Sequence, residues 1–109
     1  NMDTPTLADV NIRGVAQRLI EKRLRRNSEN LKQLQIELTL LDEQLAALSD
    51  DASEKEMRSL VSETPLALHE FRDAQKHVDA LQEQRHHLVQ AIAVQKQSQD
   101  DLLDKLGDR

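Results

Sequence analysis

One stretch of the chain, from Leu31 to Leu48, carries leucine at alternating steps of three and four residues without a miss. On an α-helix this spacing makes one narrow apolar stripe, and such a stripe needs a second helix to cover it. The repeat therefore predicts a coiled-coil seam. Its members are Leu31, Leu34, Leu38, Leu41, Leu45 and Leu48.

The covering helix is expected later in the same chain, because the alternation returns from Phe71 onward. Two helices of one chain that cover each other must run antiparallel when a short connection joins them. We therefore predict an all-α fold, a long antiparallel helical hairpin that forms a single helical domain over residues 1–109. The apolar seam positions of its second helix are Phe71, Val78, Leu81, Leu88 and Ile92.

Composition agrees with long helices and excludes most other folds. The chain has one aromatic residue, two glycines and two prolines among its 109 residues. Strands would need more turn residues and a period of two, and neither is present. The absence of cysteine excludes disulfides and thiolate chemistry.

The expected helix boundaries follow from capping signals. Thr4-Pro5 predicts the start of a first helix over about residues 5–49, and Thr6 with Asp9 offers a second cap slightly later. Acidic residues after Ser49 predict its end, because the helix dipole disfavours acids at a C-terminus.

Two further helices are expected after that point. Ser53 and Glu56 have the spacing of a capping box, which predicts a short connecting helix over about residues 53–62. Thr64-Pro65 repeats the start signal and predicts a last helix over about residues 65–106, closed by Gly107.

When the two helices pair antiparallel about this connection, the numbers of two residues that face each other have a constant sum. The predicted sum is about 119. Leu48 is then expected opposite Phe71, and Asn27 opposite Ile92. Arg85 falls at a seam position, where its guanidinium is expected either to pair with Glu37 or Glu29 across the hairpin or to extend outward along its stem. Asn27 is the one polar residue in the seam of the first helix, and such an asparagine often fixes register.

Apolar residues beside the two seam stripes predict self-association. They widen each stripe into a bundle face. We expect a homodimer of hairpins that forms a four-helix bundle; in the alternative, the helix over 53–62 covers part of this surface and leaves a monomer. The flanking residues are Ile36, Leu40, Ala47, Val89, Ala93, Val94 and Leu103.

The first helix also carries the strongest candidate site. Residues 1–27 hold six bases against three acids, whereas the remaining residues hold nine bases against seventeen acids. With the apolar residues Ile12, Val15 and Leu19, this basic stretch over 13–26 is interpreted as a binding surface for another protein. The six bases are Arg13, Arg18, Lys22, Arg23, Arg25 and Arg26.

Other uses of the basic stretch stay open. Arg18, Lys22 and Arg25 lie on one side of the helix, where they could contact the phosphates of a nucleic acid or an anionic membrane surface. The acidic composition and the lack of stacking aromatics favour a protein partner. The simplest alternative is that the bases pair with acids of a partner subunit or of the same hairpin; the nearest acids expected are Asp100, Asp101 and Asp104.

Motifs for chemistry are weak. His69, Asp73 and His77 share one helix face, and Glu83 with His86 has the spacing of di-iron bundles. No second Glu-x-x-His motif accompanies them, and no phosphate loop or nucleophile elbow is present. We therefore expect no metal, no cofactor and no enzymatic activity.

The sequence as a whole predicts a non-enzymatic coiled-coil module for protein–protein interaction, assembly or adaptor roles. Its alternative is a nucleic-acid-associated or regulatory protein that contacts phosphates through the basic stretch. No apolar run approaches the roughly 18 residues of a membrane span, and no signal-peptide segment is recognised, so we expect a cytoplasmic location.

Overall fold

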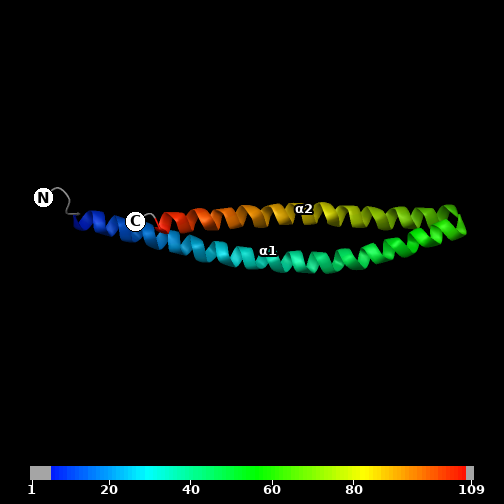
Figure 1. Ribbon diagram of the computed structural model, residues 1–109, viewed down its shortest axis with the longest axis horizontal. Coiled ribbons are helices and arrows are strands. Elements are labelled where there is room, and N and C mark those ends of the chain that lie inside the picture. The colour runs from blue at the N-terminus through cyan, green and yellow to red at the C-terminus, as the bar shows by residue number, and fades with distance from the viewer. Residues whose placement is uncertain (1–5, 108–109) are drawn as a thin grey trace. The chain divides into compact units, whose positions relative to one another are not determined.

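The computed structural model of the protein describes residues 6–107, without the side chain of Val10. It consists of two helices, α1 (Leu7–Ser62) and α2 (Pro65–Gly107), shown in Figure 1. The predicted all-α class with the two long helices of a hairpin is confirmed. The predicted start signal at Thr4-Pro5 lies outside the described residues.

Both helices begin at N-terminal capping residues that are recognisable in the sequence. The backbone N–H of Asp9 donates to Thr6 Oγ1 over 3.2 Å, and the N–H of Thr6 donates to Asp9 Oδ2 over 3.3 Å. This reciprocal pair satisfies two N–H groups that the first turn leaves without helical partners. At α2, the N–H of Ala67 donates to Thr64 Oγ1 over 3.2 Å, and Pro65 occupies the first helical position.

The predicted end of the first helix near Ser49, and with it a separate helix over 53–62, is wrong. α1 continues to Ser62 without interruption. Ala52 explains the continuation, because it extends the leucine stripe one step past Leu48 and is buried with 3% exposure. The acid Asp51 is accommodated mid-helix by an ion pair with Lys55, at 2.9 Å and four residues further on. Ser53 is therefore an exposed mid-helix residue and caps nothing.

The connection between the helices consists of Glu63 and Thr64. Glu63 has φ of 52°, the left-handed conformation that commonly ends a helix, and its N–H donates to Ser59 O over 3.1 Å. Glycine adopts this conformation without steric cost, whereas glutamate does not. The turn is thus tight and sits later in the chain than the sequence predicts.

The chain divides into two compact units. Unit 1 combines the part up to Gln33 with the part from Ala93 onward, and unit 2 is Leu34–Ile92. In unit 2 the core is a cluster of Ala52, Ala74 and Val78, against which two leucines of the stripe, Leu45 and Leu48, are packed.

Unit 2 pairs its helices one heptad away from the predicted register. Ala52 clusters with Ala74, and Asp42 pairs with Arg85, so that the partners' numbers sum to 126 and 127. The predicted sum of 119 is wrong by seven residues. The cause is the continuous α1, which moves the turn toward the C-terminus. A shift of one heptad keeps the same residues in the seam and changes only which of them face each other.

Unit 1 pairs the beginning of α1 with the end of α2. Asn27 contacts Gln99, whose number gives the same sum of 126, and the predicted Asn27–Ile92 pair is therefore wrong. In this register Gly107, the last residue of α2, lies opposite Leu19. The turns of α1 before Leu19 consequently extend past the end of α2, as Figure 1 illustrates.

The register of unit 2 is testable with cysteines, since the chain has none of its own. We expect Ala52→Cys with Ala74→Cys to form an intramolecular disulfide on mild oxidation, because both residues belong to one buried cluster. Non-reducing gel mobility and thiol titration measure the product. Ala52→Cys with Ala67→Cys, which the register of 119 would join, serves as the control, and faster closure of that pair would contradict the structure.

Candidate functional site

The nine residues assigned to the basic stretch are all exposed and all belong to unit 1. The apolar side chains of Ile12, Val15 and Leu19 are 66%, 48% and 53% exposed. With Asn11 and Ala16 they line a shallow groove of about 340 Å³. They belong to the part of α1 that extends past α2 or reaches only its end, so the second helix leaves them uncovered. Toward the C-terminus of α1, exposed basic residues follow this apolar strip.

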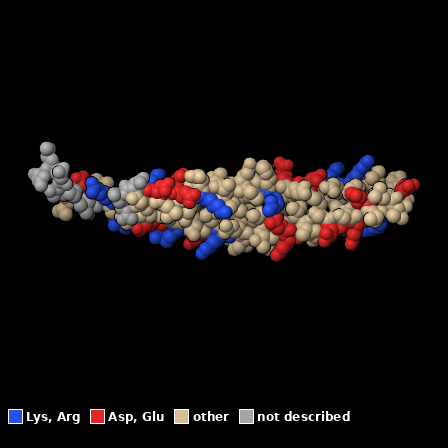
Figure 2. Space-filling view, viewed as in Figure 1, with Lys and Arg blue, Asp and Glu red and all other residues tan. Residues whose placement is uncertain are grey.

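The six bases make no ion pair within residues 6–107. This holds for Arg13, Arg18, Lys22, Arg23, Arg25 and Arg26, all of which are exposed. The nearby Asp101 instead accepts a hydrogen bond from Gln97 Nε2 over 3.0 Å. Pairing with acids of the same hairpin therefore does not account for the basic stretch in this structure. Figure 2 shows Lys and Arg atoms on the surface of this unit.

A second groove of unit 1, of about 400 Å³, lies between the two helices. Its wall is polar and carries both signs of charge, with Arg23 and Arg26 from α1 and Asp101 and Lys105 from α2. The remaining lining residues are Asn27, Asn30, Gln95, Ser98 and Leu102. Two arginines together with a lysine and one carboxylate give this groove an excess of positive charge.

Asn27 forms the buried polar floor of that groove. Its Nδ2 donates to the carbonyl oxygen of Gln95 over 2.9 Å and to Gln99 Oε1 over 2.7 Å, and its exposure is 7%. Every buried side-chain N or O atom in the described part of the chain has a partner. Asn27 therefore favours one alignment of the helices, since a shifted partner would leave its amide unsatisfied.

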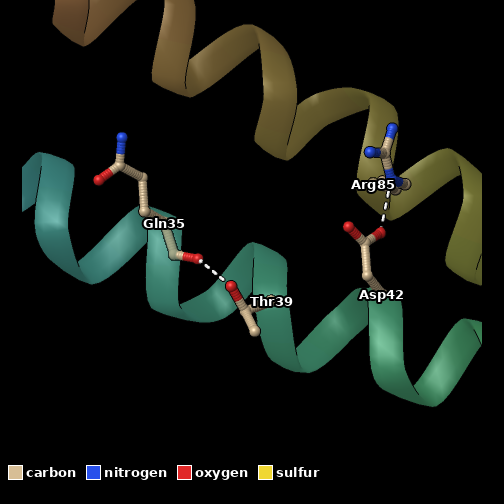
Figure 3. A network of polar contacts seen from close by, with 4 residues as sticks. All are labelled: Gln35, Thr39, Asp42 and Arg85. Atoms are coloured by element: carbon tan, nitrogen blue, oxygen red, sulfur yellow. Dashed lines mark hydrogen bonds and ion pairs between the residues drawn. The ribbon is translucent and has the colours of Figure 1, made fainter.

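Arg85, the seam arginine, pairs with an acid that the sequence did not identify. Its Nε donates to Asp42 Oδ1 over 2.6 Å across the two helices of unit 2, as drawn in Figure 3. The predicted partners Glu37 and Glu29 belong to the wrong register. The hydrogen bond and the charge of Asp42 raise the pKa of Arg85 above its ordinary value, so the guanidinium stays charged at any physiological pH.

The predicted seam residues lie between the helices. Leu41, Val78 and Ile92 are buried, and none of the other predicted apolar seam residues is exposed, whereas the seam arginine Arg85 is exposed. Those others are half-buried: Leu31, Leu34, Leu38, Leu45, Leu48, Phe71, Leu81 and Leu88. The prediction omitted Ala52, which continues the stripe and is among the most buried residues.

Unit 2 exposes apolar surface that the sequence reasoning missed. Around the turn, Met57, Leu60, Val61 and Leu66 are between 63% and 80% exposed. The segment over 53–62, predicted as a separate connecting helix, is the last part of α1. Continuing the heptad through Ala52 would have revealed these residues as outward-facing.

The flanking residues proposed for self-association are also exposed. Ile36 and Leu40 of α1 are 54% and 55% exposed, and Val89 of α2 is 40% exposed. Beside them a groove of about 460 Å³ is lined by Leu40 and residues of both helices. Those other lining residues are Glu37, Leu41, Gln44, Gln84, His87 and Leu88.

The histidine candidates form isolated pairs. His69 Nε2 lies 3.2 Å from Asp73 Oδ2, and His87 Nε2 lies 3.5 Å from Glu83 Oε1. Within residues 6–107 no three side chains of the metal-binding types gather at one point. The predicted pairs with His77 and His86 therefore do not extend into a larger set of ligands here.

In comparisons with known proteins, no family model, no curated protein and no solved structure matches the chain. Across the described residues, neither helix has a segment both long enough and apolar enough to cross a membrane. The assignment of a function therefore depends on the surfaces described above.

Replacing Asn27 tests the contribution of its hydrogen bonds to Gln95 and Gln99. We expect Asn27→Ala to lower the free energy of unfolding by about 2 kcal/mol, because it leaves the Gln95 carbonyl and the Gln99 amide without their partner. Thermal denaturation followed by circular dichroism measures the loss. The matched control is Asn30→Ala, at an exposed position of the same groove; equal losses in the two variants would contradict this role.

Proposed function

We propose that this protein is a non-enzymatic coiled-coil module that acts by presenting helical surfaces to other proteins, its own second copy included. The observation that carries the proposal is the distribution of apolar side chains. In the described part of the chain six apolar residues are buried, whereas fourteen large apolar residues are exposed. Exposed apolar residues that gather into a contiguous surface mark interaction sites, and those of α1 recur with heptad spacing along one face.

Self-association into a homodimer is the simplest use of these surfaces. Closed two-fold dimers are the commonest oligomers, and two long hairpins that pack together form a four-helix bundle. The exposed apolar residues Ile36, Leu40 and Val89 support this arrangement. The cytoplasmic location expected from the sequence is part of the same proposal, and fractionation of the source cells tests it.

Sedimentation equilibrium tests the proposed dimer by measuring the mass of the particle in solution. We expect the wild type to sediment as a dimer, and Ile36→Glu with Leu40→Glu to sediment as a monomer, because four charges would be placed in the apolar contact of the dimer. Circular dichroism should show unchanged helicity, since both residues are exposed in the single chain.

The matched control adds the same charge on α2 through His69→Glu and Ala80→Glu, at two exposed positions of unit 2 away from Val89. We expect this control to remain a dimer. A wild type that is monomeric at the highest accessible concentration contradicts the proposal, and so does a Glu variant that associates as well as the control.

A second candidate function is weak binding to a nucleic acid through Arg18, Lys22 and Arg25. The specific observation in its favour is that these cations are exposed and have no acidic partner within the described residues. Phosphate contacts of this kind release counterions and make binding strongly dependent on salt.

Fluorescence anisotropy with a short DNA duplex tests this candidate. Three phosphate contacts predict a slope of about −3 for the logarithm of the binding constant against the logarithm of the salt concentration. Reversal of all three charges, Arg18→Glu, Lys22→Glu and Arg25→Glu, should abolish the binding. Absence of binding at low salt would rule out this candidate.

A further inference from the structure

α1 carries a second heptad stripe on the face opposite the seam, and every member of it is exposed. In unit 1 the stripe contains Ile12, Val15, Leu19, Lys22 and Arg26, again at alternating steps of three and four. We call these five residues the cationic part. Three apolar residues are followed by two bases, and none of the five contacts α2 closely enough to be buried.

Unit 2 carries the continuation of the same stripe near the turn. Asp50, Glu54, Met57 and Val61 have the same spacing, and all four are exposed. We call these residues the anionic part. Here two acids come first and two apolar residues follow, so the order along the helix is the reverse of that in the cationic part.

We propose that the occupant of this stripe is a second copy of the chain, whose α1 lies antiparallel to the first, with the cationic part of one copy on the anionic part of the other. This proposal rests on the interaction module proposed above and specifies its contact. Each copy carries both parts, so both find their complement on another copy.

Charge and apolar matching select a single alignment. When partner numbers sum to 76, Leu19 faces Met57 of the second copy, and Val15 faces its Val61. In the same alignment, Lys22 faces Glu54 and Arg26 faces Asp50 of the second copy. Each of these four pairs is then either apolar with apolar or base with acid, the complementarity that favours one alignment of an antiparallel coiled coil.

Alternative alignments bring unlike groups together. A shift by one heptad, to a sum of 69, sets Leu19 against Asp50 and Val15 against Glu54 of the second copy, where apolar side chains would desolvate carboxylates. A parallel arrangement in register sets Lys22 against Lys22 and Glu54 against Glu54. Like charges at such positions repel, and they select against that orientation.

The four charged side chains are available for the contact. Lys22, Arg26, Asp50 and Glu54 are exposed, and none of them forms an ion pair in the described chain. The apolar residues Leu19 and Met57 are 53% and 63% exposed. The charges fix orientation and register, whereas burial of the apolar residues supplies most of the affinity.

Charge exchange tests the contact. One variant carries Lys22→Glu with Arg26→Glu, and the other carries Asp50→Lys with Glu54→Lys. We expect each alone to associate at least about tenfold more weakly than the wild type in sedimentation velocity, because acids would face acids or bases would face bases. An equimolar mixture should recover association, since each reversed part then meets a complement. Both pairs of substitutions in one chain should recover it as well.

The control Lys96→Glu with Lys105→Glu makes the same change in net charge as the first variant, at exposed positions of α2 in unit 1, and should associate like the wild type. If the first variant loses helicity, the neutral pair Lys22→Gln and Arg26→Gln replaces it, with weakened association expected.

The outcomes distinguish the proposed α1 contact from the interaction module on which it rests. Variants that associate like the wild type, or a mixture that recovers nothing, overturn the α1 contact and leave the interaction module in place. A wild type that does not associate at all overturns the proposed self-association together with this contact.

Discussion

Burial of the leucine stripe of α1 against α2 is the interaction on which the rest of the structure depends. Helices as long as α1 and α2 gain most of their stability from an apolar face that is packed, because helix propensity alone contributes little. In unit 2 the packing centres on small residues, Ala52 and Ala74, with Val78 between the leucines. Small residues at this level let the two helices approach closely just before the turn.

The seam between the two helices is narrow. It covers one side of each helix and leaves other apolar residues in contact with water. On α1 these residues are not scattered, because they repeat with the same heptad spacing as the seam itself. The inner stripe of α1 stabilises the fold of its own chain. The outer stripe, with bases in unit 1 and acids in unit 2, is the surface that we propose for a partner.

The sequence predicted the two long helices and their inner faces, but neither the end of α1 nor the alignment of the helices. The caps at Thr6 and Thr64 and the seam from Leu31 to Leu48 were recognisable because each depends on local spacing. The register was wrong by one heptad because a repeat of seven is satisfied equally well after a shift of seven. The position of the turn and the polar partners of Asn27 decide between such registers. The acids and serines after Leu48 suggested a helix end that the burial of Ala52 overrides.

In the candidate site, too, the sequence predicted the features that depend on one helix and missed those that depend on the register. Exposure of the basic stretch followed from its place on the helix, whereas the pair of Arg85 with Asp42 could not be found until the register was known. The apolar residues at the turn, such as Met57 and Val61, were missed because they were assigned to a covering helix. Errors in register therefore led directly to errors about partners, while assignments that depend on one helix alone were unaffected.

Hydrogen exchange at two protein concentrations tests most directly the claim that α1 serves two interfaces. Amides of stably packed helices exchange slowly, and a new interface slows the exchange of the segments that it covers. At high concentration we predict added protection in residues 12–26 and 50–61 of α1, with no change in residues 69–80 of α2, which lie away from Val89. Added protection confined to α2, or identical exchange at both concentrations, would contradict the account.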